Sequence, residues 1–344
     1  MFKSKILVIG STPHKGVSKT YGGTTVLMQN FLNFLDINQF KEFKFIQSNK
    51  FNFKGAQFFN TIYLLSKTIV ILPFCSKVML NAASNGAFII APLIFFYSKL
   101  FGKKFIFRMF GGNLIDLIKS KPKFLVYLFF KSVIKSDLIF VETKNLVSYI
   151  SNYNSNVFWF PNVREKSEIK KNKKEYSKKF VFISHIKKSK GVIEIIEAFK
   201  ELDNTFFVDL YGPLKDNVLE DIKLPPNVDY KGVLSPDEVT VKLNEYDVLL
   251  LPTYHEGEGY PGIIIEAFSL GIPVISTIWK SIPEIVNNDL GILINPKNIP
   301  ELKDAILYFD SGNYLKFSLC AEKHFQQFDS SFVNKKIINK ITNI

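Results

Sequence analysis

The stretch GEGYPGIIIEAFSLGIPVIST, residues 257–277, decides how the chain is interpreted. Three of its glycines follow the pattern G-x-G-x-x-G, and the apolar run after Pro261 predicts a helix. Proline is well tolerated where a helix begins. The free amides of a first helical turn, with glycines around them, can hold a phosphate. The stretch therefore predicts a diphosphate site, and the first question is whether that diphosphate belongs to a redox cofactor.

A redox cofactor requires a strand leading directly into the first glycine and an acidic residue at the end of the next strand. Here TYHE (253–256) separates the preceding strand from Gly257. The next strand ends in Trp279 and Lys280, with no acidic residue in reach. A P-loop is also absent, because the spacing from Gly10 would need glycine at the position of Lys15. The glycine pattern thus lacks the surroundings that a redox dinucleotide requires, and the P-loop motif for a nucleoside triphosphate is missing.

The rest of the chain predicts two doubly wound α/β domains, because apolar strand candidates alternate with helical stretches on both sides of a charged segment. We expect a first domain over 1–163, a linker over 164–179 and a second domain over 180–329, with a terminal helix over 330–344 packing back onto the body. The expected strands are 5–10, 43–47, 77–80, 104–110, 137–143 and 157–160, then 179–186, 206–212, 228–232, 247–253, 273–278 and 291–295. The apolar run Ala87–Tyr97 is too short to span a bilayer and predicts a buried helix.

An ordered set of motifs then points to a family. The motifs are Glu258 and Glu266 in the pattern Glu-x7-Glu, Gly271-Ile272-Pro273-Val274, Pro283-Glu284-Ile285 and Lys190-Gly191 before a helix. With these the chain resembles the retaining nucleotide-sugar glycosyltransferases of family 4, which have the GT-B fold, two Rossmann-like domains facing a central cleft. Bacterial enzymes of surface-polysaccharide assembly, such as O-antigen or capsule, are the members it looks most like.

The resemblance implies roles for residues of the second half. Glu266 would accept hydrogen bonds from the nucleotide ribose, and Glu258 would meet hydroxyls of the donor sugar. Lys190 would face the diphosphate of a UDP- or GDP-linked sugar, together with His185, which stands where the family has arginine. A nearby pyrophosphate should favour the cationic form of that imidazole. The loop and helix start that would surround the donor are Gly259, Tyr260, Pro261 and Gly262. The alternative for Glu258 is a solvated loop carboxylate, and for Glu266 a carboxylate near a helix N-terminus that the helix dipole favours. The alternative for His185 is a strand-end histidine bonded to backbone.

The first half offers weaker candidates. Gly22 and Gly23 precede a helical stretch and are a candidate donor-phosphate loop, or an ordinary glycine turn. Gly111 and Gly112 follow the fourth strand, and the family often carries histidine at the position of Phe110. We therefore take Arg108 as a substitute acceptor contact, with a surface ion pair as the alternative. Glu142 ends the fifth strand and is a further acceptor candidate.

Charge is unevenly distributed: residues 1–170 carry 23 Lys+Arg and 7 Asp+Glu, although the whole chain has a net charge of +13. A basic half suggests an anionic partner, and we expect an acceptor such as a lipid-diphosphate-linked glycan at an anionic membrane surface. The sequence KSKPKFLVYLFFKSVIK suits such an interface, or a core helix with solvated lysines. Two cysteines and no secretion signal fit a cytoplasmic protein.

No Asp-x-Asp triplet and no histidine spacing suited to a metal occur, so we expect no metal and no bound cofactor apart from the donor substrate. Two other classes of function stay open. Phe110 and His185 favour a non-catalytic protein of the same fold that binds a nucleotide-sugar or glycan for a partner enzyme. The basic half alone would fit nucleic-acid binding, but no recognisable reading module accompanies it.

Overall fold

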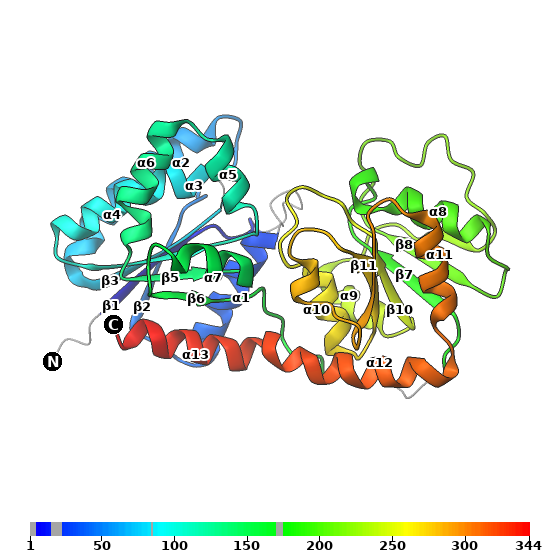
Figure 1. Cartoon of the computed structure of the whole chain (residues 1–344). Helices are drawn as coiled ribbons and strands as arrows, with labels where there is room; N and C mark the ends of the chain where they lie inside the picture. The colour runs from blue at the N-terminus through cyan, green and yellow to red at the C-terminus, as the bar shows by residue number, and fades with distance from the viewer. Residues whose placement is uncertain (1–4, 15–22, 84, 170–174) are drawn as a thin grey trace. The chain divides into compact units, whose positions relative to one another are not determined.

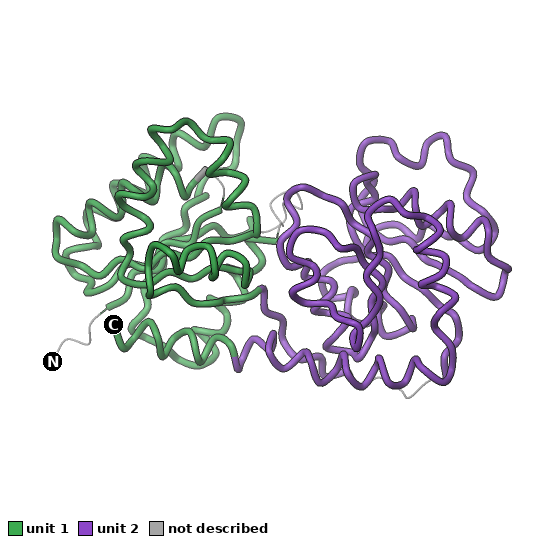
Figure 2. The backbone as a smooth tube through the Cα atoms, viewed as in Figure 1, with its two compact units in different colours: residues 1–161, 333–344 green, residues 162–332 purple. Residues whose placement is uncertain are grey.

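The computed structural model describes residues 5–14, 23–83, 85–169 and 175–344. The chain forms two compact units, residues 1–161 with 333–344 and residues 162–332 (Figure 2). Each unit is described by itself below. Residues 164–169 and 175–179 of the expected linker fall within the bounds of the second unit.

In the described part of the first unit, six parallel strands form one sheet in the order β2-β1-β3-β4-β5-β6. The strands are β1 (Lys5–Gly10), β2 (Phe43–Gln47), β3 (Cys75–Ala82), β4 (Lys104–Met109), β5 (Leu138–Val141) and β6 (Val157–Trp159). Each overlaps one of the apolar runs expected to be a strand. These runs are nearly continuous because helices cover both faces of a parallel sheet, so residues pointing either way are buried.

Helices pack on both faces of this sheet (Figure 1). One face carries α2 (Ala56–Ile71), α3 (Asn85–Phe88), α4 (Ile90–Leu100), α5 (Leu114–Ser120), α6 (Lys123–Lys131), α7 (Lys144–Ser151) and the short 3-10 turns Leu72–Phe74 and Val133–Lys135. Alternate strand residues such as Leu7, Leu80 and Phe107 belong to the core beneath that layer. The opposite face carries α1 (Gly23–Ile37) and α13 (Ser330–Thr342).

The terminal helix packs on the first unit through apolar residues of its second half. Ile337, Ile338 and Ile341 are buried. Lys77 of β3, only 8% exposed, donates to the carbonyl oxygens of Ile341 at 2.8 Å and Thr342 at 2.7 Å. A cation at a helix C-terminus satisfies carbonyls that have no partner within the helix and complements the helix dipole. This interaction fixes the end of α13 against the middle of the sheet.

The run Ala87–Tyr97 is helical apart from a turn at Ile89, which separates α3 from α4, and it is not wholly buried. Ala91, Ile94 and Phe95 face the core, whereas Ile89, Leu93 and Phe96 are 47–49% exposed. The expectation of a buried helix is therefore wrong for one of its faces. Within the described residues no helix is both long and apolar enough to cross a membrane.

The described part of the second unit likewise has six parallel strands, in the order β12-β11-β10-β7-β8-β9. They are β7 (Lys179–Ile183), β8 (Phe207–Tyr211), β9 (Val228–Tyr230), β10 (Val248–Leu251), β11 (Val274–Thr277) and β12 (Gly291–Ile294). One face carries α8 (Val192–Lys200) and α11 (Ile299–Tyr308), and the other carries α9 (Pro236–Leu243), α10 (Gly262–Ser269) and α12 (Ser311–His324). The sheet order makes β7 and β10 neighbours, although 64 residues separate the end of one from the start of the other along the chain. Their carboxyl-end loops therefore meet.

Candidate active site

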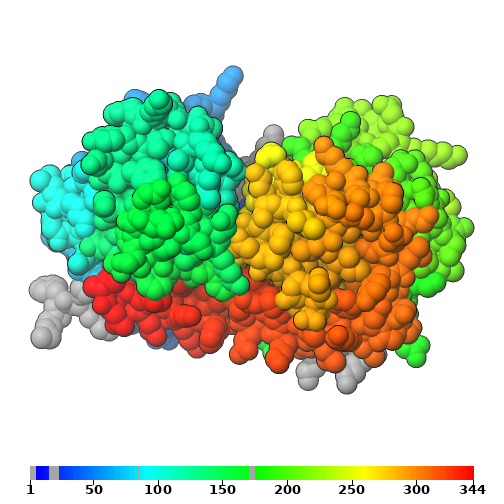
Figure 3. Space-filling view, viewed as in Figure 1, coloured from blue at the N-terminus to red at the C-terminus, as the bar shows by residue number. Residues whose placement is uncertain are grey.

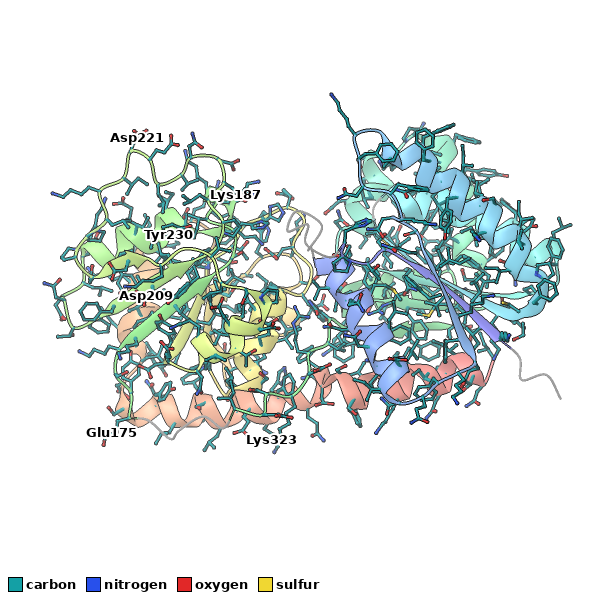
Figure 4. The ribbon with its side chains drawn as sticks, turned by 180° about the vertical axis from the view of Figure 1, so that it is seen from behind. Glu175, Lys187, Asp209, Asp221, Tyr230 and Lys323 are labelled. Carbon is teal, nitrogen blue, oxygen red and sulfur yellow. The ribbon has the colours of Figure 1, made fainter. Side chains whose placement is uncertain are left out.

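Two loops at the carboxyl ends of β7 and β10 form the centre of the candidate site. In open parallel sheets ligands bind outside the carboxyl ends of the strands. The amide of Tyr254 donates to the carbonyl of Ser189 at 2.8 Å, and the Ser189 hydroxyl lies 3.4 Å from Nδ1 of His255. In Figure 4 the labelled Lys187 marks this end of the sheet, and Glu175, which precedes β7, lies at the opposite end. The loops are thus held together by hydrogen bonds of the main chain and of side chains.

Lys190, expected to face the diphosphate, and Glu258, expected to meet the donor sugar, are in direct contact. Nζ of Lys190 lies 2.6 Å from Oε2 of Glu258, which also accepts a hydrogen bond from the Thr253 hydroxyl at 2.8 Å. Glu258 is only 8% exposed. Removing one partner of a buried, hydrogen-bonded ion pair costs about 3–5 kcal/mol, because the other charge is left without compensation. Each of the two side chains therefore fixes the position of the other.

Gly191 is needed where it stands, directly after Lys190. Its φ of +81° is in the left-handed region, and a Cβ built there would lie 2.3 Å from the carbonyl oxygen of Pro252. That distance leaves no room for a side chain. The neighbouring atom belongs to the backbone and so cannot move aside easily. The Lys190-Gly191 motif thus has a local cause: the turn before α8 packs directly on the end of β10.

The helix expected to hold a phosphate is α10, which begins at Gly262 with Pro261 as its N-cap. The helix thus starts one residue later than expected, within the usual uncertainty of helix ends. Tyr260, 2% exposed, donates its hydroxyl proton to Glu284 at 2.6 Å, and its carbonyl accepts from Asn162 at 2.9 Å. The loop before the helix is therefore anchored on two sides.

Arg164, which the sequence placed in a linker, belongs to this site. Its guanidinium pairs with Glu266 of α10, donates to Oδ1 of Asn162 and donates to the Val163 carbonyl at 3.0 Å. A Cβ at Gly262 would lie 1.7 Å from Nη2 of Arg164, so glycine makes room for the guanidinium over the start of the helix. The main chain of Arg164 also bonds to Phe328 and Ser330. The two glutamates of the Glu-x7-Glu pattern thus each have a cationic partner.

One signal in the sequence pointed to Arg164. The chain has 42 lysines but only two arginines, Arg108 and Arg164. A planar guanidinium makes several directed hydrogen bonds at once, which a lysine cannot do. Arg164 uses this geometry, so the rarity of arginine in a lysine-rich chain is a signal by which the residue could have been found.

His185 lies in the loop after β7, with positive charges around it. Partial desolvation of the ring, followed by the charges of Lys215, Lys190, Lys187 and His255, lowers the pKa of His185 below its ordinary value. Desolvation first, and then the charge of Lys190, likewise lower the pKa of His255. The expected cationic histidine is therefore disfavoured in the protein without a ligand. Clustered cations of this kind make the end of the sheet attractive to a polyanion.

The candidate residues of the first unit lie in different parts of its structure. Gly111, with φ of +83°, donates its amide proton to Oε2 of the buried Glu142 at 2.9 Å, and Gly112 follows it. Gly23 begins α1, and Gly22 lies outside the described residues.

Arg108, expected to contact an acceptor, is instead a core residue. It is 2% exposed, and its guanidinium carbon lies 3.4 Å from the centre of the Phe160 ring and 4.5 Å from that of Phe110. Burial lowers the pKa of Arg108 to about 9, and the charge of Glu142 opposes that shift. A side chain enclosed in this way has no surface for a ligand in this structure.

In the part of the chain that the structure describes, no cluster of three His, Cys, Asp or Glu side chains is arranged to hold a metal ion.

Residues 163–316 match the family model of the glycosyl transferases group 1. The matched residues make up less than half of the chain and lie wholly within the second unit, which is therefore similar to a group 1 glycosyltransferase domain. The match covers the loops after β7 and β10, the start of α10 and Arg164. The matched residues therefore include those that form the candidate site.

Curated relatives align with about a third of this chain. The putative colanic acid biosynthesis glycosyltransferase WcaL of Escherichia coli K12 is 32% identical over 130 residues, 34% of this chain and 32% of that protein. The putative teichuronic acid biosynthesis glycosyltransferase TuaC of Bacillus subtilis is 28% identical over 134 residues, 38% of this chain and 32% of that protein. The matched part thus spans about a third of the length of these relatives.

Solved structures are similar over the whole chain. Sucrose-phosphate synthase from Thermosynechococcus elongatus has a TM-score of 0.77 at 11% identity, covering 99% of both chains. HepE of Anabaena in complex with UDP has a TM-score of 0.72 at 12% identity, covering 99% of this chain and 100% of that one. At such identities the likeness shows the fold alone. It confirms the predicted GT-B class with two Rossmann-like units.

Replacing Arg164 by glutamine should weaken the binding of UDP or GDP about tenfold, or ~1.4 kcal/mol. The reason is that Glu266 then loses the charged hydrogen bond that fixes its orientation. Isothermal titration of the purified protein measures this. Lys166→Gln, an exposed cation two residues away, is the matched control and should bind like wild type. Equal affinity in Arg164→Gln and wild type would contradict a positioning role for Arg164.

Nucleoside diphosphate binding should become tighter as the pH falls from 9 to 5. The pKa of His185 is lowered in the protein without a ligand. The charge of a bound diphosphate would raise it, so binding would take up a proton between the two pKa values. Affinity should rise as the pH falls through the bound-state pKa and level off below the free-state pKa. His185→Gln should lose this part of the pH dependence, while titration of the ligand phosphate itself remains. Identical pH profiles in His185→Gln and wild type, with a changed profile in His255→Gln, would assign the effect to His255.

Proposed function

We propose that the protein is a retaining, metal-independent glycosyltransferase that moves a sugar from a nucleotide-sugar to a glycan or lipid-linked acceptor in cell-surface polysaccharide biosynthesis. The observation that carries the proposal is the buried Lys190–Glu258 pair beside the glycine-rich start of α10, with Glu266 in the helix that follows. The family match of residues 163–316 supports the transferase class. Relatives named for colanic acid, teichuronic acid and amylovoran biosynthesis support the polysaccharide setting.

The donor would bind with its diphosphate toward Lys190, His185 and the amides that begin α10. Nζ of Lys190 is held by Glu258 in the protein without a ligand. A diphosphate would share that ammonium group, which frees Glu258 to accept hydrogen bonds from sugar hydroxyls. Glu266 would accept hydrogen bonds from the ribose while Arg164 holds its other side. HepE of Anabaena, which has the same fold, was solved in complex with UDP, and this supports a nucleoside diphosphate as the ligand.

Transfer breaks the bond between the anomeric carbon and the diphosphate oxygen, and the bonding electrons go to that oxygen. Fixed positive groups stabilise the charge as it develops and need little reorganisation, which makes this kind of stabilisation effective. The acceptor hydroxyl oxygen forms the new bond on the face that the diphosphate leaves, and its proton goes to the diphosphate. Configuration is thereby retained. Lys190 and His185 supply the positive charge that a metal ion supplies in other transferases.

Lys190→Ala should lower the rate of sugar transfer, or of donor hydrolysis without acceptor, by at least about 100-fold, equivalent to ~2.7 kcal/mol. Purified protein is screened with UDP- and GDP-sugars by thermal shift, and release of nucleoside diphosphate is then followed with and without chelator. Lys188→Ala removes an exposed lysine of the same turn and should keep the wild-type rate. Donor binding without transfer or hydrolysis for any donor would instead favour the non-catalytic alternative, a glycan- or nucleotide-sugar-binding protein that supports a partner enzyme.

We also propose that the first unit binds the cytoplasmic face of an anionic membrane, where a lipid-linked acceptor would lie. The unit carries 23 Lys+Arg against 5 Asp+Glu. The helix layer of α2, α4 and α6 exposes many apolar side chains. The exposed large apolar residues of these helices, with Phe74 of the 3-10 turn that follows α2, are Phe58, Phe59, Ile62, Ile69, Val70, Phe74, Leu93, Phe96, Leu100, Phe124 and Tyr127. Figure 3 shows the surface over α4 and α6 in cyan to green-cyan. Apolar side chains beside lysines match a bilayer of anionic lipids in chemistry and in charge.

The protein should float with liposomes whose phosphatidylglycerol content is raised, and should dissociate at about 0.5 M salt because charges are then screened. Phe58→Ser combined with Phe74→Ser should weaken flotation at least about tenfold, since each buried phenyl ring contributes ~1.5–3 kcal/mol. Leu319→Ser, a similarly exposed apolar residue of the second unit, is the matched control. Absence of salt-sensitive flotation at every lipid composition would rule out this surface as a membrane contact.

A further inference from the structure

A third loop, residues 278–284 after β11, is hydrogen-bonded to the loop after β10. The strands β10 and β11 are neighbours in the sheet, so the loops that follow them leave it side by side (Figure 1). At the ends of the two strands the Ser276 hydroxyl donates to the carbonyl of Leu251 at 2.6 Å. The Thr277 hydroxyl donates to the carbonyl of Thr253. The two loops are therefore joined where they begin.

Trp279 links this third loop to the turn that carries Glu258. Its indole Nε1 donates to the carbonyl of His255 at 2.9 Å. The main-chain amide of Glu258 donates to the same carbonyl at 3.1 Å. A carbonyl oxygen has two lone pairs and can accept both hydrogen bonds. The indole thus holds the acceptor to which the main chain of Glu258 is bonded.

The third loop also holds the other side of that turn. Glu284 accepts the hydroxyl proton of Tyr260 at 2.6 Å, and Tyr260 is only 2% exposed. Glu258 therefore lies between two fixed residues, His255 three positions before it and Tyr260 two positions after it. A short segment held on both sides leaves little freedom for the carboxylate that it carries.

Lys280, next to Trp279, has an uncommon backbone conformation. Its φ of +48° lies in the left-handed region, which is unfavourable for a residue with a long side chain. Such conformations persist where the surrounding contacts fix the chain, and they are frequent at functional sites. Here the amide of Ile282 donates to the carbonyl of Trp279 at 3.0 Å, and the Lys280 ammonium group lies 3.0 Å from the Glu256 carboxylate. These contacts restrict the main chain from which the indole projects.

The hydrogen bond of the indole distinguishes Trp279 from a tryptophan of the core. Trp279 is half-buried and Ile278 before it is 54% exposed, so this loop lies at the surface of the unit. The proposed function assigns the Glu258 carboxylate to the hydroxyls of the donor sugar. It assigns the diphosphate to Lys190, His185 and the amides that begin α10. Loss of the indole hydrogen bond should therefore affect recognition of the sugar and spare the diphosphate.

We propose that Trp279 is a positioning residue that fixes Glu258 for recognition of the donor sugar. The loop after β11 thereby sets the selectivity among sugars carried by one nucleotide. The inference rests on the proposed transferase function and deepens it at the same site. The indole acts through the carbonyl of His255 and needs no contact with the ligand. When Glu258 is less well placed it holds Lys190 less firmly, and the ammonium group stays available to the diphosphate.

Trp279→Phe removes the indole N–H and keeps an aromatic ring. Hydrolysis of the preferred donor among UDP-glucose, UDP-galactose, GDP-glucose and GDP-mannose, without acceptor, should fall about fivefold in kcat/KM, as expected for one lost hydrogen bond. The preference between the two sugars of that nucleotide should narrow. Binding of UDP or GDP, measured by isothermal titration, should not weaken. A merely structural role would lower hydrolysis and nucleotide binding in parallel, and that result would overturn the proposal.

Trp159→Phe is the matched control. The chain has two tryptophans, and Trp159 of the first unit likewise donates its indole N–H to a carbonyl, that of Glu142, at 3.0 Å. Because Glu142 is a candidate acceptor contact, the comparison uses hydrolysis without acceptor. Trp159→Phe should match wild type in rate and in selectivity. An equal loss in both tryptophan variants, or no loss in Trp279→Phe, would contradict the positioning role.

A stability measurement tests the coupling between Trp279 and Glu258 without any ligand. Urea unfolding is measured for Trp279→Phe, for Glu258→Gln and for the double variant. Residues in one hydrogen-bond network are not additive, so the unfolding equilibrium constant of the double variant should differ at least about threefold from the value that the single changes predict. Trp159→Phe combined with Glu258→Gln should be additive. Tyr260→Phe, which releases the other fixed residue, takes the place of Trp279→Phe if that variant does not fold.

The two kinds of measurement keep this inference separate from the proposed function. Wild-type protein that neither binds nor hydrolyses any nucleotide-sugar would contradict the transferase function. Non-additivity of Trp279→Phe and Glu258→Gln would in that case still support the placement of Glu258 by the indole. Additivity of these two changes, in a protein that does hydrolyse a donor, would overturn the inference and leave the transferase function standing.

Discussion

The ion pair between Lys190 and Glu258 is the interaction on which the candidate site depends. It joins the loop after β7 to the loop after β10, and its carboxylate is further held by Thr253. A pair this buried is weak evidence for stability, because desolvation offsets much of the attraction. The pair is better explained by the way it fixes the positions of the two loops. The two loops bring a cation, a carboxylate and the start of α10 to one end of the sheet. The neighbouring places of β7 and β10 in the strand order make that possible.

The two arginines of the chain show how position decides what a guanidinium does. Arg164 keeps partial exposure and binds Glu266, Asn162 and a carbonyl, so its charge acts within the site. Arg108 is enclosed by aromatic rings, and Nη1 has no hydrogen-bond partner in the described structure. Stacking on Phe160 and Phe110 compensates part of the desolvation, as cation–π contacts do when water is excluded. The rarity of arginine in the sequence identifies both residues as unusual. Only the packing around each one shows that Arg164 belongs to the candidate site and that Arg108 belongs to the core.

Much of the fold could be predicted because its physical cause is local. Buried parallel strands give near-continuous apolar runs, so KILVIG and DVLLLPT identify β1 and β10 to within a few residues. The Lys190-Gly191 motif was identified from its resemblance to a family pattern, and the structure gives its physical cause, a turn with no room for a side chain. The partner of Glu266 could not be predicted, because Arg164 lies 102 residues away along the chain. The half-exposed face of α4 was missed for a related reason: an apolar run does not say which of its faces meets the core.

The first unit is strongly basic as a whole, but the described residues that line its cavity of about 430 Å³ between β3 and α2 are uncharged, so charge alone does not explain what the unit binds. A strongly basic unit can attract anions from a distance, and this long-range effect needs no particular residue. Recognition at short range depends on what lines the cavity, and that lining is uncharged among the residues described. The basic surface is the property on which the proposed membrane contact depends, and it identifies no ligand for the cavity. In the proposed membrane contact the lysines of the helix layer would act over this longer range, and the exposed apolar side chains beside them would act at short range.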